Sequence, residues 1–175
     1  MHLNAVVSQK VHGSAGQFDI DLPLTGNPGI ECRSGGATSD YQMVFTFANT
    51  LTSVGGASVS TGTGTVNSSA IDSSDAHQYV VNLTGVTNAQ VITVSLTNVS
   101  DSIGNFSSAV PASMGVLLGD TSGDGVVNSA DITQTRRQSG NVADSSNFRE
   151  DVTLDGVINS ADITLVRRQS GTALP

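Results

Sequence analysis

Oxygen-bearing side chains recur at regular spacing in two twelve-residue stretches near the end of the chain. Both stretches place them at positions 1, 3, 5, 9 and 12, with glycine at position 6. The first set is Asp120, Ser122, Asp124, Asn128 and Asp131, with Gly125, and the second is Asp151, Thr153, Asp155, Asn159 and Asp162, with Gly156. At position 7, Val126 or Val157 would add its backbone carbonyl. Because calcium takes 6–8 oxygen ligands, the spacing predicts that each stretch wraps one calcium ion, two in all.

Two departures from the EF-hand pattern lower the expected affinity. Position 12 is aspartate instead of glutamate, and position 3 carries a hydroxyl where a carboxylate or an amide is usual. Three carboxylates in each loop indicate dissociation constants of about 10⁻⁶ to 10⁻³ M. Magnesium suits the loops less well, because it demands a tighter octahedron and keeps its waters. The alternative is that both stretches are ordinary polar turns, which two copies with the same ligand order disfavour.

The elements that position these side chains are themselves repeated. Asp120–Gly140 and Asp151–Gly171 are offset by 31 residues and are identical at fifteen of twenty-one positions. Each loop is followed by a predicted helix, at 130–138 and at 161–169, which a glycine is placed to end. Neither loop is preceded by an amphipathic entering helix, and Asn141–Glu150 is expected to be a short helix or a turn. Each copy is therefore a half EF-hand.

The first two thirds of the chain predict strands. Period-two alternation of apolar and polar residues marks four of them, at Gln17–Leu22, Tyr41–Ala48, Gln78–Leu83 and Val91–Val99. In the last of these, Ile92, Val94, Leu96 and Asn98 would share the buried face. Weaker strands are expected at Asn4–His12, Ala57–Ser60 and Gly115–Leu118. Seven to nine short strands separated by Gly- and Ser-rich turns predict an immunoglobulin-like or jelly-roll β-sandwich, so the chain is mainly β with a small α module.

Composition excludes several classes of function. A formal charge of −8 and a single lysine argue against a nucleic-acid partner. Cys32 is alone, so it can form no internal disulfide and is expected to be at least half-buried. No apolar stretch approaches the ~18 residues of a membrane span. No signal peptide is visible, which indicates a processed chain or a fragment. His2, His12 and His77 lack metal-ligand spacing, and no catalytic motif is legible, so we expect no enzyme.

The motif D-x-[NST]-x-D-G-x-[VI]-N-S-A-D-[IL]-T-x-x-[KR]-R occurs twice between Gly119 and about Leu174. This region resembles the duplicated half EF-hand of a type I dockerin, and it predicts a division into a sandwich (1–118) and a dockerin-like module (119–175). The resemblance implies a calcium-dependent docking module that binds a cohesin-like β-sandwich on a bacterial scaffold or cell surface, outside the cell. The preceding strands are loosely similar to β modules of large bacterial secreted proteins. The resemblance also implies recognition by loop positions 10 and 11 and helix positions 17 and 18, which are Ser129, Ala130, Arg136, Arg137, Ser160, Ala161, Arg167 and Arg168.

Three alternatives stay open at this point. The paired arginines could be a solvated helix face that balances the acidic loops. Because no flexible linker separates the two parts, the module could instead bind the sandwich of another copy and build a filament or surface layer. It could also cap its own sandwich and recruit nothing. In each case the module has few large apolar residues, so calcium is expected to supply part of its folding free energy.

Overall fold

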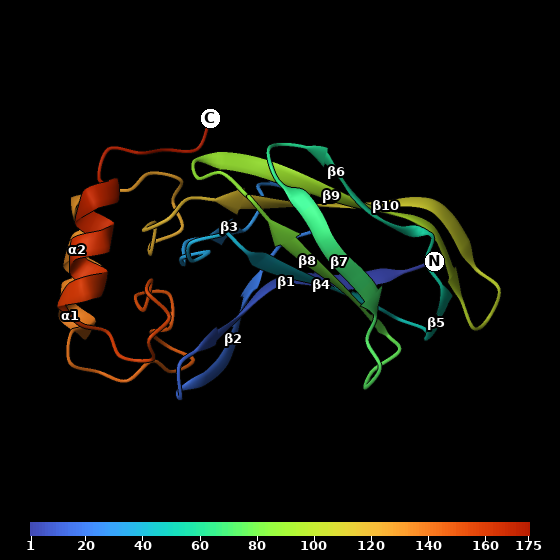
Figure 1. Ribbon diagram of the computed structural model, residues 1–175, viewed down its shortest axis with the longest axis horizontal. Coiled ribbons are helices and arrows are strands. Elements are labelled where there is room, and N and C mark those ends of the chain that lie inside the picture. The colour runs from blue at the N-terminus through green and yellow to red at the C-terminus, as the bar shows by residue number, and fades with distance from the viewer.

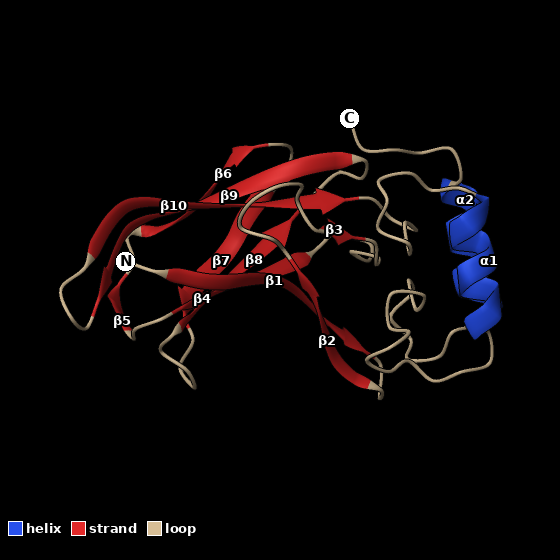
Figure 2. Ribbon diagram, turned by 180° about the vertical axis from the view of Figure 1, so that it is seen from behind, coloured by secondary structure: helices blue, strands red, loops and turns tan.

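Ten strands and two helices make up the chain, and the computed structural model describes all residues from 1 to 175. The strands form the body of the molecule, and both helices lie at the end away from the N-terminus (Figure 1). Viewed from behind, loops separate the helices from the strands (Figure 2). The chain is thus mainly β with a small helical part at its C-terminal end, as the sequence predicts.

The strands form two sheets. One has the order β2-β1-β4-β8-β7, with every neighbouring pair antiparallel. Its members are β1 (Leu3–His12), β2 (Gly16–Asp21), β4 (Tyr41–Phe47), β7 (Thr65–Ile71) and β8 (Gln78–Thr84). The other has the order β3-β10-β9-β5, with β6 also paired to β9. Its members are β3 (Ile30–Glu31), β5 (Leu51–Ser53), β6 (Gly56–Thr61), β9 (Gln90–Asp101) and β10 (Phe106–Val116).

A core of 19 buried residues lies between the sheets. Phe45 and Phe47 enter it from β4, while Ile92, Val94 and Leu96 enter it from β9. Alternate residues of β9 are buried because the side chains of a strand point to opposite faces in turn. This arrangement confirms the predicted β-sandwich.

The structure corrects several details of the predicted strands. Asn98 does not share the buried face of β9: its φ of 49° marks an irregularity at which the alternation shifts, so Asn98 is exposed and Val99 is buried. The final strand begins at Phe106, well before the predicted Gly115. Strands β3, β5 and β7 were not predicted, because two are very short and β7 is a largely exposed, Ser-rich edge strand.

The C-terminal part is built from two copies that support each other. Helices α1 (Ser129–Gln138) and α2 (Ser160–Gln169) pack side by side and begin one residue earlier than predicted. Val127 of the first loop exchanges backbone hydrogen bonds with Gly171 and Thr172, which follow α2. Ile158 of the second loop does the same with residues that follow α1. The segment 141–150 is a turn and contains no helix.

A second, smaller apolar cluster joins the two parts. Its five buried members are Ile30, Leu117, Val127, Val152 and Val166. Two belong to the sandwich and three to the helical part, so neither side encloses this cluster alone. Cys32 is fully buried, as expected, and burial raises the pKa of its thiol to about 12. The helical part therefore packs on the end of its own sandwich.

Candidate calcium sites

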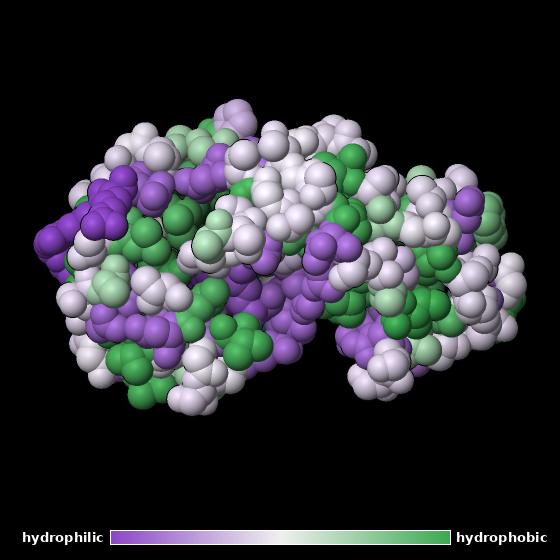
Figure 3. Space-filling model, viewed as in Figure 1, coloured by the Kyte–Doolittle hydropathy of each residue, from purple (hydrophilic) through white to green (hydrophobic).

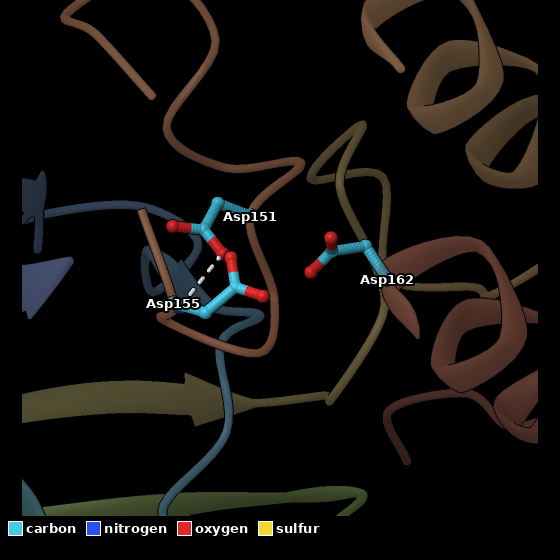
Figure 4. A group of neighbouring side chains, drawn as sticks. All are labelled: Asp151, Asp155 and Asp162. Carbon is cyan, nitrogen blue, oxygen red and sulfur yellow. Dashed lines mark hydrogen bonds between the residues drawn. The ribbon is translucent and has the colours of Figure 1, made fainter. Parts of the chain in front are cut away.

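The second loop brings three carboxylates together. Asp151, Asp155 and Asp162 offer ligand oxygens that all lie within 4.8 Å of one another (Figure 4). Asp151 and Asp155 come from the loop, and Asp162 comes from the first turn of α2. The Asp162 carboxylate accepts hydrogen bonds from the backbone N–H groups of Asn159 (2.8 Å) and Thr153 (3.0 Å), which fix it across the loop.

The charge of this group is not neutralised by the protein. Neither Asp155 nor Asp162 forms a salt bridge, and the only such partner of Asp151 is His12. Burial, reinforced by the neighbouring Asp151 carboxylate, raises the pKa of Asp162 against the hydrogen bonds from Asn159 and Thr153. Oxygen ligands alone, three of them carboxylates that repel each other, fit a hard divalent cation of the size of calcium.

Asp151, at position 1, is held differently from the other two. Burial alone would raise its pKa, but hydrogen bonds from His12 and from the backbone N–H groups of Gly156 and Asp155 outweigh it and lower that pKa. The Gly156 N–H donates to Oδ2 at 2.9 Å, and the Asp155 N–H donates to Oδ1 at 3.2 Å. Because Gly156 has a φ of 90°, a left-handed conformation, the loop can turn sharply enough to make the first of these bonds.

The first loop repeats this backbone scaffold. Gly125 N–H donates to Asp120 at 2.9 Å, and Asn128 N–H donates to Asp131 at 2.8 Å. However, only the second loop has three carboxylates within 4.8 Å of one another. The hydroxyl at position 3 also differs, since Ser122 donates to Asp120 (3.2 Å) whereas Thr153 donates to Asp162 (2.8 Å). The two loops share a fold but not the same degree of preorganisation.

The asparagines at position 9 cap the helices. The side-chain oxygens of Asn128 and Asn159 each accept the N–H of the alanine two residues later at 2.7 Å. The Asn159 Nδ2 then donates to Asp155 (3.0 Å) and to the Val157 carbonyl (3.0 Å), while the Asn128 Nδ2 lies 3.4 Å from the Val126 carbonyl. The aspartate three residues after each asparagine completes a capping box. This capping pattern is legible in the sequence, and the asparagines predicted only as ligands are therefore also helix caps.

Four functional side chains at the junction were not predicted. Glu31 and Arg33 form a fully buried ion pair, and His12 bridges Arg33 to Asp151. Arg149 donates to the backbone oxygens of Asp120 (2.9 Å), Thr121 (2.9 Å) and Ile30 (3.2 Å), and so ties both parts together. His12 and Arg149 gain their partners only when distant segments meet, so no local pattern marks them. Glu31 and Arg33 lie two positions apart, but only burial turns this common spacing into a dry ion pair.

The residues to which the resemblance assigns partner recognition lie on the outer end. Ser129, Ala130, Arg136, Arg137, Ser160, Ala161, Arg167 and Arg168 are all exposed. They belong to α1 and α2, which lie on the side of the module away from the sandwich (Figure 1). At the helical end, hydrophilic side chains gather along the outer edge beside smaller apolar patches (Figure 3). Packing of the loops on the sandwich therefore leaves these positions uncovered.

Comparison with known proteins finds a family match for the C-terminal part of the chain. Residues 118–169 match the family model described as the dockerin type I domain. At the level of that family, the match indicates a non-catalytic, calcium-dependent module for docking between proteins. A search of the curated proteins and of the solved structures finds no match. Neither helix of the structure is long and apolar enough to cross a membrane.

Proposed function

We propose that this chain is a non-catalytic, extracellular docking protein whose C-terminal module (119–175) binds a cohesin-like β-sandwich when calcium is present. The sandwich (1–118) would carry the module on a bacterial cell surface or a secreted scaffold. The observation that carries the proposal is the orientation of the module: its loops face the sandwich, and all eight recognition positions remain exposed. The match to the dockerin type I domain supports the same function.

In this proposal each loop holds one calcium ion. The aspartates at positions 1, 5 and 12 would supply carboxylate oxygens, and Val126 or Val157 would supply a carbonyl. The hydroxyls of Ser122 and Thr153 would be neutral ligands. Because the side-chain oxygens of Asn128 and Asn159 cap helices, these asparagines would act through water, as position 9 often does. The ions would hold each helix on its loop and keep the outer face in shape.

Self-assembly is the alternative reading of the module. Its loop face already contacts its own sandwich, so a neighbouring copy could not bind the same face without displacing that contact. A filament would therefore have to form through the exposed helix face. We favour a separate partner on that face, because the match to the dockerin type I domain supports docking between proteins.

Arginine variants on the two helices test the docking proposal. Arg136→Gln with Arg137→Gln alters one copy, and Arg167→Gln with Arg168→Gln alters the other. Because the copies are alike, each pair alone is expected to change affinity for a cohesin-type domain by less than about 3-fold, whereas the quadruple variant loses at least about 100-fold, as for hot-spot arginines. Calorimetric titration of the cohesin-type domain, with calcium and with excess chelator, measures this.

A charge-matched control separates recognition from net charge. Thr52→Glu, Ser58→Glu, Thr61→Glu and Thr63→Glu together change the charge of the sandwich by the same amount as the quadruple arginine variant, on exposed positions. This control should bind like the wild type, and chelator should abolish binding of every variant. Binding that survives in chelator, or a quadruple variant with wild-type affinity, would contradict the proposal. Calcium-dependent polymers of the chain alone would favour the filament.

A further inference from the structure

Asp151 has a partner that its counterpart in the first loop lacks. His12, the last residue of β1, places Nδ1 at 2.9 Å from Asp151 Oδ2, and both side chains are fully buried. All hydrogen bonds to the Asp120 carboxylate come instead from within its own loop. One calcium loop is therefore bonded through a ligand side chain to the sandwich, and the other is not.

The hydrogen-bond network around His12 sets its tautomer. Arg33 Nη1 lies 3.1 Å from His12 Nε2, and a guanidinium can only donate. Nε2 therefore accepts, and Nδ1 carries the hydrogen that is donated to Asp151. Arg33 is itself fixed by Glu31 and by the carbonyls of Phe18 and Ser8. The imidazole thus has one orientation, with its donor aimed at the carboxylate.

This bond orients the carboxylate for a ligand role. Asp151 Oδ2 accepts from His12 and from Gly156 N–H, so this oxygen is occupied by the protein. The other oxygen, Oδ1, accepts one longer bond, from the backbone N–H of Asp155 at 3.2 Å, and points toward that residue (Figure 4). A histidine that bonds a metal-ligating carboxylate from outside the ligand set fixes its rotation, and the loss of such outer-shell partners typically lowers metal affinity by about 10- to 100-fold.

The backbone of the β1–β2 hairpin also touches the second loop. A Cβ on Gly13, in the hairpin turn, would lie 2.3 Å from the Asp155 carbonyl oxygen. A Cβ on Gly156 would lie 2.8 Å from the His12 carbonyl oxygen, whereas Gly125, at the same position of the first loop, has open space around it. Two independent close approaches therefore accompany the side-chain bond, and both involve only the second loop.

We propose that His12 is a positioning residue of the second calcium site, and that calcium binding there is linked to attachment of the module to the β1–β2 hairpin. The inference rests on the proposed calcium binding by the second loop. The hairpin holds Asp151 in its ligand orientation before the ion arrives, so this loop binds calcium more tightly than the first. By reciprocity, calcium in the second loop strengthens the contact with the hairpin.

Two substitutions of His12 separate the effects of its hydrogen bonds to Asp151 and to Arg33, because each keeps one bond and loses the other. His12→Asn places an amide N–H near the position of Nδ1, which keeps the donor to Asp151 and loses the acceptor for Arg33. His12→Gln places an oxygen near the position of Nε2, which keeps the acceptor and loses the donor. Both variants are made in the full chain with Asp124→Ala, which silences the first loop, and calcium affinity is measured by calorimetry.

We expect His12→Gln to weaken calcium binding by about 10- to 100-fold and His12→Asn to weaken it by less than about 3-fold. With Asp155→Ala, which silences the second loop instead, neither variant should change binding. His77→Gln is the matched control, because His77 forms the same contact with Asp75 at 2.8 Å on the surface of the sandwich. Equal losses for both His12 variants, no loss for His12→Gln, or equal losses at both loops would overturn the inference. A parent chain that binds no calcium would overturn the proposed function as well.

Hydrogen exchange tests the linkage without any change at His12. Calcium is expected to slow amide exchange in residues 12–16 by at least about 10-fold in the full chain, because a ligand stabilises the state that binds it. Asp155→Ala should abolish this protection, and Asp124→Ala should leave it in place. Protection that follows the first loop, or none at all while calcium still binds, would show that the hairpin is not coupled to the second site.

Discussion

Replacing Glu31 with glutamine is expected to lower the free energy of unfolding by about 3–5 kcal/mol, the usual cost of breaking a buried ion pair. Glu31 and Arg33 are both fully buried, and they form two parallel bonds, Nε to Oε1 at 2.8 Å and Nη2 to Oε2 at 2.7 Å. Glutamine keeps the shape and one acceptor oxygen, but the guanidinium charge loses its counter-charge in a dry interior. Urea denaturation with saturating calcium measures the change.

The exposed pair of His77 and Asp75 provides the control for this prediction. Its side chains are 43% accessible, so Asp75→Asn should cost less than about 1 kcal/mol. In a double-mutant cycle with Arg33→Met, Glu31→Gln should show a coupling of at least about 2 kcal/mol, because removal of either charge strands the other. A loss below about 1 kcal/mol for Glu31→Gln would mean that the pair does not hold the junction.

The same pair sets an expected dependence on pH. Burial alone would raise the pKa of Glu31, but the charge and hydrogen bonds of Arg33 outweigh it and hold that pKa below the ordinary value of 4.5. A lowered carboxyl pKa stabilises the fold above the ordinary pKa, and that stability is lost as the pH falls through the lowered value. The stability difference between the wild type and Glu31→Gln should therefore narrow on acidification below about pH 4. A difference that stays constant would contradict this reading.

Gly156→Ala is expected to destabilise the chain much more than Gly125→Ala, although both glycines have a φ of 90°. The left-handed conformation costs alanine about 1–2 kcal/mol at either position. At Gly156 the added Cβ would also lie 2.8 Å from the His12 carbonyl oxygen, while at Gly125 it meets nothing. Relief of that clash must move the loop away from the hairpin, which should add about 1–3 kcal/mol.

The free energy of unfolding of both glycine variants, measured in calcium and in chelator, identifies the cause of the larger loss in Gly156→Ala. In calcium, Gly156→Ala should lose about 2–5 kcal/mol in total, and Gly125→Ala only the shared conformational part. Calcium affinity of the second loop should fall only in Gly156→Ala. Equal losses of unfolding free energy in the two variants would indicate that backbone strain alone causes them. The close approach to the hairpin would then contribute nothing.

The sequence predicted the turns and helices of the C-terminal repeat well because their information is local. Ligand spacing, the position 6 glycines and the end of each helix all lie within about twenty residues of one another, and the repeat displays each feature twice. The strongest strands were predicted for the same reason, since alternation is a property of a single segment. Where a strand is short, or exposed as β7 is, alternation gives little signal and the strand was missed.

The junction could not be predicted, because it depends on residues far apart in the chain. His12 meets Asp151 across 139 positions, and Arg149 meets Ile30 across 119. An isolated histidine in a sequence has no visible partner, so the sequence showed only that His12 lacks metal-ligand spacing. The sequence left open that the module caps its own sandwich, but it did not indicate which residues meet.

The packing changes what a docking module would do in this chain. A dockerin-like module on a flexible linker lets its cargo swing, whereas here a shared apolar cluster and Arg149 hold the module in one orientation. A partner bound to the helix face would therefore be set at a defined angle to the sandwich. Calcium would stabilise the docking face of the two helices. Through the second loop, it would also strengthen the contact between the module and the sandwich.

Calcium titration of the metal-free full chain by calorimetry tests the central claim most directly. We predict two binding events of different affinity, the tighter of which disappears in Asp155→Ala and the weaker of which disappears in Asp124→Ala. Calcium should also raise the free energy of unfolding as the sites fill. The absence of saturable binding up to about 10 mM calcium, above the weakest range of such loops, would contradict the account. Unchanged binding by the chain that combines Asp124→Ala with Asp155→Ala would contradict it as well.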